Sequence, residues 1–135
     1  MTDRFTPEER SRIMSNIRAK NTRPEVLVRR LLHGMGYRFR LHQKNLPGKP
    51  DVVLPRHRKI IFVNGCFWHG HKCKRGSRPS SNAKFWNDKI DGNMSRDLRK
   101  REELEKLGWN VLTVWECETK DVEQLANQLR TFMLS

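Results

Sequence analysis

The sequence predicts an α/β fold in which a mixed β-sheet is flanked by helices. Helix-like and strand-like apolar patterns follow one another in the order α, β, β, β, α, β, α, which is typical of helices packed on a sheet. The chain has 135 residues, of which 36% are hydrophobic, and this composition suits one domain with a modest core. We therefore expect a basic N-terminal arm over residues 1–20 and a single domain over residues 21–135.

Two helices are predicted near the start of the chain. Ile13 and Ile17 lie four apart within residues 11–20, which favours a short helix whose other side chains are largely cationic. The next helix begins after Thr22, because Thr22-Arg-Pro-Glu25 is a capping box with proline in the first turn. The helix is expected to end at Gly34 and Gly36. Its apolar stripe consists of Val28, Leu31, Leu32 and Met35.

Three strands are expected next. Residues 37–41 alternate as a strand does, and residues 46–51 contain a turn. Residues 52–54 continue extended, since Pro50 disfavours helix in Lys49. A turn at residues 56–59 then leads into residues 60–63, which we expect to pair antiparallel with the preceding strand.

Helix and strand alternate in the rest of the chain. Residues 85–90 are predicted as a short helical turn, and residues 94–107 as a charged amphipathic helix with Leu98 and Leu104 inward. Residues 109–115 form the last predicted strand. Apolar residues at helical spacing indicate a final helix, namely Val122, Leu125, Leu129 and Phe132.

Residues 65–73, Gly-Cys-Phe-Trp-His-Gly-His-Lys-Cys, carry two thiols and two imidazoles directly after an apolar run. The third cysteine of the chain follows the last predicted strand, which completes four ligands for a tetrahedral structural Zn²⁺; the alternative is a set of reduced, buried thiols. His69 and His71 would point to opposite sides of an extended segment, so one binds metal and the other is left as a base. The expected zinc ligands are Cys66, His71, Cys73 and Cys117.

The formal net charge is +13, and the excess is confined to the first part of the chain. Residues 1–80 contain 19 Lys and Arg against 5 Asp and Glu, whereas residues 81–135 contain 9 against 10. This predicts a polyanionic partner. Nucleic acid is favoured over an anionic membrane, because the basic residues are spread over loops rather than along one helix face.

The expected compartment is the cytoplasm. No apolar run approaches the length of a membrane span, and the N-terminal sequence lacks the apolar centre of a signal peptide. Three cysteines, an odd number that a metal explains better than disulfides, agree with a reducing environment.

Asp51 is the notable carboxylate, since it begins an apolar strand within the most basic part of the chain. Phosphodiester cleavage needs a divalent metal to neutralise the phosphate and lower the pKa of water, and carboxylate oxygens hold Mg²⁺. The alternative to a metal ligand is that Asp51 is a turn residue or an ion-pair partner of Arg40 or Lys49. Glu25 is explained by the capping box, yet it would help hold metal-bound water if its helix packs against the Asp51 strand.

His69, left outside the zinc set, is a candidate general base. A base is usually oriented through its other ring nitrogen, and Asp97 on the following helix can accept that proton. The alternative for Asp97 is a solvated acid beside Arg96 and Arg101.

The aromatic residues divide between core and ligand contact. Trp109 and Trp115 are assigned to the core. Phe67 and Trp68 are adjacent bulky rings that cannot both enter one small core, so at least one is expected to be exposed. Exposed rings of this kind can wedge between base pairs, where the cost of unstacking is least at a mismatch.

These motifs resemble one family, the very short patch repair (Vsr) endonucleases, which are bacterial DNA mismatch endonucleases partnered with cytosine-5 methylation. The resemblance covers nearly the whole chain, and the Gly-Cys-Phe-Trp-His block with a distal Trp-Glu-Cys is highly specific. The matching segments are Pro-Gly-Lys-Pro-Asp51, residues 62–73, Phe85-Trp86, Arg96-Asp97, Gly108-Trp109 and residues 114–117.

The resemblance implies a restriction-endonuclease-like fold, a structural zinc, and Mg²⁺-dependent nicking of one strand at a thymine-guanine mismatch. Asp51 matches the metal-binding aspartate and His69 the catalytic histidine, while Val63 offers a backbone carbonyl to Mg²⁺. The zinc ligands match as assigned above. The intercalating set comprises Phe67, Trp68 and Trp86, with Met14 of the arm at the minor groove.

The chain departs from its apparent relatives at three positions. Some of them have histidine where this chain has Asn64, and a histidine-rich run where it has Gly70 and Lys72. The usual nuclease Glu-x-Lys element is absent after Phe62, which the resemblance implies is normal for the family.

We expect a monomeric bacterial enzyme that acts on double-stranded DNA containing a mismatch, with repair proteins as candidate partners. Hydrolysis 5′ of the mismatched thymine would leave a 3′-hydroxyl and a 5′-phosphate, with Asp51 holding Mg²⁺ and His69 as general base or water positioner. The rival interpretations are a zinc-stabilised DNA-binding module without catalysis and a nuclease of related fold without mismatch preference.

Overall fold

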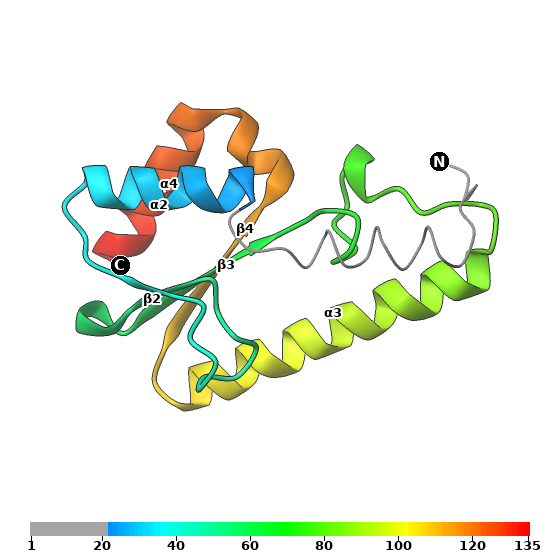
Figure 1. The fold of residues 1–135 in the computed structure, drawn as a ribbon, viewed down its shortest axis with the longest axis horizontal. Coiled ribbons are helices and arrows are strands. Elements are labelled where there is room, and N and C mark those ends of the chain that lie inside the picture. The colour runs from blue at the N-terminus through cyan, green and yellow to red at the C-terminus, as the bar shows by residue number, and fades with distance from the viewer. Residues whose placement is uncertain (1–21) are drawn as a thin grey trace.

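The structure is a computed structural model that describes residues 22–135, and it consists of a four-stranded sheet between helices. Figure 1 shows α2 (Arg23–Gly34) and α4 (Val122–Leu134) on one face of the sheet and α3 (Ala83–Lys106) on the other. The mixed α/β class and the predicted order of elements are confirmed. The helix expected at residues 11–20 lies outside the described residues. The strands, in their order across the sheet, are β1 (Arg40–Leu41), β2 (Val52–Leu54), β3 (Lys59–Asn64) and β4 (Asn110–Trp115).

The sheet is mixed because its strands are connected in two ways. A loop over residues 42–51 joins β1 to β2, a short 3-10 turn joins β2 to β3, and both pairs are antiparallel. The connection from β3 to β4 runs through α3, and these two strands are parallel, as a helical crossover requires.

The two faces of the sheet form two apolar clusters. Successive side chains of a strand point to opposite faces, so Val52 and Leu54 pack with α2 and α4, whereas Val53 packs with Leu104 of α3. Buried residues of α2 and α4 complete the first cluster, namely Val28, Leu32, Leu125, Leu129 and Met133.

The threonine half of the predicted capping box is present at the start of α2, whereas the Glu25 carboxylate contacts Arg29. The Glu25 backbone N–H donates to the Thr22 hydroxyl at 3.4 Å, and a proline occupies the first turn. Leu31 and Met35 lie partly buried against the first cluster, so the predicted apolar stripe is confirmed.

α3 corrects two expectations. The turn at residues 85–90 and the helix at residues 94–107 are parts of one helix of 24 residues, since a single internal glycine costs a helix only about 1 kcal/mol. Leu98 is 60% exposed rather than inward, whereas Leu104 is fully buried. Six residues correspond to about 600° of helical rotation, which places these two leucines roughly 120° apart.

The first strand is shorter than predicted. Only Arg40 and Leu41 pair with β2, although Tyr37 and Phe39 pack against the first cluster. None of the described helices combines the length and the apolar character needed to cross a membrane.

Candidate active site and metal cluster

A cleft of about 1130 Å³ brings most of the predicted site residues together. Its walls come from the start of α2, the turn before β2, the end of β3, the loop that follows, and the middle of α3. The predicted residues that line it are Glu25, Asp51, Val63, Phe67, Trp68, His69, His71 and Asp97. Met14 lies outside the described residues.

Asp51 is held against the end of β3. The Val63 backbone N–H donates to Asp51 Oδ2 at 2.7 Å, and the side chain is only 20% exposed. Burial raises the pKa of Asp51 to about 6, an effect that the Val63 N–H opposes and the nearby Glu25 reinforces. Within the described residues no ion pair joins Asp51 to Arg40 or Lys49, so the predicted alternative of a surface ion pair is not what the structure shows.

Glu25 reaches the same cleft from the first turn of α2. It is buried, with 6% of its surface exposed, and its Oε2 lies 2.9 Å from Arg29 NH2 and 3.6 Å from His42 Nε2. α2 therefore packs against the Asp51 strand, which was the condition for a role beyond the cap.

His42 is a cleft residue that the sequence analysis missed. Its Nδ1 lies 4.0 Å from Asp51 Oδ1, and the ligand atoms of Glu25, His42 and Asp51 all lie within 4.8 Å of one another. Only strand pairing brings His42 to this site. Leu41 pairs with Val52, so His42, which follows Leu41, faces Asp51, which precedes Val52. The backbone N–H of His42 donates to the carbonyl of Asp51 at 3.3 Å.

His69, on the loop after β3, forms a pair with Asp97 of α3. Nδ1 of His69 lies 2.5 Å from Oδ2 of Asp97, and since a carboxylate only accepts, the ring proton sits on Nδ1. This leaves Nε2 as the nitrogen able to accept a proton. The alternative of a solvated helix-face acid is wrong for Asp97, although its side chain is 40% exposed.

The loop that carries His69 is fixed to α3. The Asn93 side-chain amide donates to the Trp68 carbonyl at 2.9 Å, and Arg78 contacts Asn87 at 3.0 Å and Asp91 at 2.9 Å. These contacts attach the loop to α3 near both of its ends.

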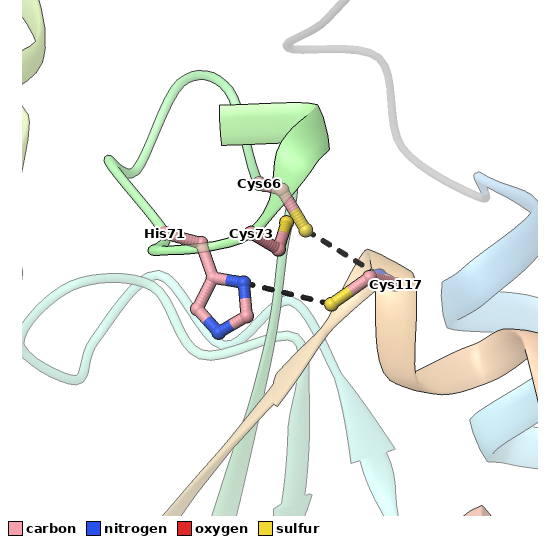
Figure 2. A group of neighbouring side chains, drawn as sticks. All are labelled: Cys66, His71, Cys73 and Cys117. Atoms are coloured by element: carbon pink, nitrogen blue, oxygen red, sulfur yellow. Dashed lines mark hydrogen bonds between the residues drawn. The ribbon is translucent and has the colours of Figure 1, made fainter. Parts of the chain in front are cut away.

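The four predicted zinc ligands converge from two segments, as Figure 2 shows. Three come from the loop after β3, and Cys117 comes from the 3-10 turn η3 (Glu116–Lys120) that follows β4. All four ligand atoms lie within 4.8 Å of one another, with Cys117 Sγ 3.5 Å from His71 Nδ1. His71 is in the cluster and His69 is not, so the expected division of the two histidines is what the structure has.

Three thiols and one imidazole at this spacing are a donor set that suits tetrahedral Zn²⁺. Burial raises the pKa of Cys66 to about 12 and also raises that of Cys117, whereas contact with His71 lowers the pKa of Cys73 to about 6. A bound dication would favour the thiolate form of all three cysteines and offset the repulsion between them.

The predicted exposure of the aromatic pair is not observed. Trp68 is buried at 8% exposure and Phe67 is half-buried, since both rings pack edge to face with each other and with the buried Trp86. The ring centroids are 5.1 to 5.6 Å apart. Trp86 Nε1 is buried and has no hydrogen-bond partner within the described residues.

The two tryptophans assigned to the core differ. Trp109 packs on the α3-side cluster beneath Arg58, whose guanidinium lies 4.2 Å from the ring centroid. Trp115 is instead half-buried at the cleft, stacked on the metal-cluster residue His71 at 4.3 Å, which corrects the core assignment.

Cationic side chains also line the cleft. They come from the turn before β2, the loop after β3 and α3, and they include Lys44, Lys49, Lys72, Arg96, Lys100 and Arg101. Carboxylates and a histidine at the floor, with cations around them, are suited to chemistry on a polyanion.

The fold and this site together define an endonuclease-like domain. The structure is similar to the homing endonuclease I-Bth0305I catalytic domain, with a TM-score of 0.60 and 24% sequence identity over 84% of this chain and 96% of that one. Residues 2–75 match the family described as DNA mismatch endonuclease Vsr.

The chain belongs to the Vsr family of DNA mismatch endonucleases, which confirms the resemblance found in the sequence. It is 52% identical to the type II nicking enzyme V.XorIIP of Xanthomonas oryzae pv. oryzae, over 98% of each chain. It is 40% identical to the DNA mismatch endonuclease Vsr of Escherichia coli, over 97% of this chain and 84% of that protein. The protein is therefore a DNA endonuclease.

Proposed function

We propose that this endonuclease nicks one strand of double-stranded DNA on the 5′ side of the thymine in a thymine-guanine mismatch. Such mismatches arise by deamination of 5-methylcytosine. The observation that carries the proposal is the placement of Asp51 and the His69–Asp97 pair in one cationic cleft. The names of two relatives support it, since one is a nicking enzyme and the other a mismatch endonuclease.

Asp51 is proposed to hold Mg²⁺, together with the backbone carbonyl of Val63. The raised pKa of Asp51 supports this, because a buried carboxylate near Glu25 needs a cation to ionise fully at neutral pH. Bound Mg²⁺ would neutralise the phosphate and lower the pKa of a nearby water.

His69 is proposed as the general base. Its Nε2 would accept a proton from the attacking water, and Asp97 would stabilise the resulting imidazolium through Nδ1–H. The water oxygen bonds to phosphorus, the bond from phosphorus to the 3′-oxygen breaks, and that oxygen takes up a proton. The products are a 3′-hydroxyl and a 5′-phosphate.

Structural Zn²⁺ is proposed at Cys66, His71, Cys73 and Cys117. This cluster ties the loop after β3 to the turn after β4, and the same loop carries His69. The role of the metal would be to fix the loop rather than to act on the phosphate.

Recognition of the mismatch is assigned to the aromatic cluster of Phe67, Trp68 and Trp86, with Met14 of the arm as a further contact. Two of these rings are buried in the absence of DNA, so their insertion requires the cluster to open on the duplex. The indole N–H of Trp86, which has no acceptor among residues 22–135, supports this, because a buried donor without an acceptor would destabilise the closed arrangement.

The deciding experiment compares three labelled duplexes, with a thymine-guanine mismatch, a cytosine-guanine pair and a thymine-adenine pair, each with and without Mg²⁺. We expect one nick, 5′ of the mismatched thymine, with ends that DNA ligase can reseal. Equal nicking of all three duplexes would instead identify a nuclease without mismatch preference. Tight binding with no product would identify a DNA-binding module.

A further inference from the structure

His42 lines the cleft, and the proposed mechanism gives it no role. It follows β1, and its ring lies between two carboxylates, with Nε2 3.6 Å from Glu25 Oε2 and Nδ1 4.0 Å from Asp51 Oδ1. Only 17% of its side chain is exposed. An imidazole placed between two acids, with all three ligand atoms within 4.8 Å, is an arrangement able to hold a cation.

We propose that His42 is a nitrogen ligand of the divalent cation held at Asp51, and that the site therefore binds Mn²⁺ in preference to Mg²⁺. The inference rests on the proposed assignment of the cation to Asp51. Mg²⁺ takes oxygen ligands almost exclusively, whereas imidazole nitrogen suits the transition metals. A histidine in this ligand set is thus a determinant of metal selectivity.

The geometry fits coordination through Nδ1. Two ligand atoms that are each about 2.1 Å from one ion lie roughly 3 to 4 Å apart, depending on the angle between them. The 4.0 Å between His42 Nδ1 and Asp51 Oδ1 is at the upper end of that range. A small rotation of the ring would shorten it.

The second ring nitrogen lies near a carboxylate that could fix its tautomer. Metal-binding histidines usually donate the other ring N–H to a carboxylate, which fixes the tautomer. Glu25 Oε2, 3.6 Å from Nε2, is the carboxylate that would take this role once the ring moves slightly toward it. Glu25 would then act through His42 rather than only through water.

Arg29 is the competing cation in this cluster. Its NH2 lies 2.9 Å from Glu25 Oε2 and 3.1 Å from His42 Nε2. A guanidinium only donates, so Nε2 accepts in this arrangement and the ring proton lies on Nδ1, facing Asp51. Coordination through Nδ1 therefore requires the proton to move to Nε2, with Arg29 keeping its contact with Glu25.

The test uses the full-length, zinc-loaded protein without DNA, titrated with Mn²⁺ alone. Electron spin-echo spectroscopy detects a nitrogen bonded to Mn²⁺ through its ¹⁴N coupling. We expect this coupling in the parent, its loss in His42→Gln, and its retention in His69→Gln, which removes the other imidazole near Asp51. The dissociation constant for Mn²⁺ should rise about tenfold or more in His42→Gln, and that for Mg²⁺, measured by competition, should change much less.

Circular dichroism and zinc content will show whether each variant is folded. The parent spectrum can refute the proposal even if a variant is not. A parent without ¹⁴N coupling overturns the proposal, and so does coupling that survives His42→Gln and disappears in His69→Gln. Mg²⁺-dependent nicking by a parent that lacks the coupling would show that His42 is not a ligand while the proposed function stands. Parent-like nicking by Asp51→Ala would instead remove the proposed catalytic site.

Discussion

Nδ1 of His69 lies 2.5 Å from Oδ2 of Asp97, so a loop residue and a helix residue 28 positions apart form one hydrogen-bonded pair. The loop residue alone could rotate. Contact with the carboxylate fixes the ring orientation and its tautomer, and it leaves Nε2 toward the cleft.

Asp97→Asn should slow nicking by roughly 10²-fold to 10⁴-fold, because an amide can stabilise the wrong histidine tautomer and cannot offset the imidazolium charge. Single-turnover nicking rates measure this, and mismatch binding should stay near that of the parent. The matched control is Asp88→Asn, an exposed acid on the same helix that pairs with Lys84 at 2.9 Å. In a His69→Ala background Asp97→Asn should have little further effect, and full additivity of the two losses would contradict the pairing.

Asp51→Asn should stabilise the protein in Mg²⁺-free buffer at neutral pH. Burial raises the pKa of Asp51 from its ordinary value of 3.8 to about 6, so the folded state binds the proton more tightly than the unfolded state. The stability that this group contributes is fully present below about pH 3.8 and is lost as the pH rises through about 6. The variant should therefore match the parent near pH 4 and exceed it by up to about 3 kcal/mol above pH 6.

Denaturant unfolding at several pH values measures that difference. Added Mg²⁺ should stabilise the parent at neutral pH and leave Asp51→Asn unchanged, since ligands that bind only the native state raise its stability. A variant less stable than the parent at pH 7.5 would mean that the carboxylate is already stabilised by neighbouring groups.

Cys117→Ser should lose zinc and destabilise the whole domain, because metal binding contributes directly to folding free energy. The loss should also slow nicking, since the cluster fixes the loop that carries His69. Metal analysis and thermal unfolding provide the measurements, and Lys120→Ser, an exposed change in the same 3-10 turn, is the control. Full zinc content in the cysteine variant, or no zinc in the purified parent, would refute the site.

Local patterns in the sequence were enough for most of the fold and for the grouping of the three cysteines with His71. The cap at Thr22 and the strand that ends at Asn64 depend on residues that are neighbours in the sequence. Three of the four cluster residues were recognisable because they lie close together in one loop. The fourth, Cys117, was identified because it is the only remaining cysteine in the sequence.

Long-range packing determines what the sequence did not reveal. His42 reaches the site only through the pairing of β1 with β2, and nothing in its own segment indicates that register. Lys59 was predicted to belong to a turn, yet it begins β3 and is buried. Its Nζ donates to backbone oxygens at the end of α4, those of Met133 at 3.0 Å and Ser135 at 2.9 Å. Both cases require knowledge of which distant segments meet.

Truncating Phe67 and Trp68 together should reduce mismatch discrimination more than it reduces DNA affinity. A wobble pair is more easily unstacked than a Watson-Crick pair, so inserted rings favour mismatched duplex, whereas phosphate contacts from the cationic cleft act on any sequence. The Phe67→Ala/Trp68→Ala protein should therefore bind matched duplex nearly as the parent does, with a similar salt dependence, and lose most of its preference for thymine-guanine.

The comparison needs nicking and binding assays on both duplexes, with zinc content measured to exclude unfolding, because Trp68 is buried in the cluster. Each lost stacking contact should cost about 1 to 3 kcal/mol on the mismatched duplex. A folded, zinc-loaded double variant that keeps the discrimination ratio of the parent would show that the rings serve only as packing. Mismatch choice would then have to come from hydrogen bonds to base edges, made by other residues along the cleft.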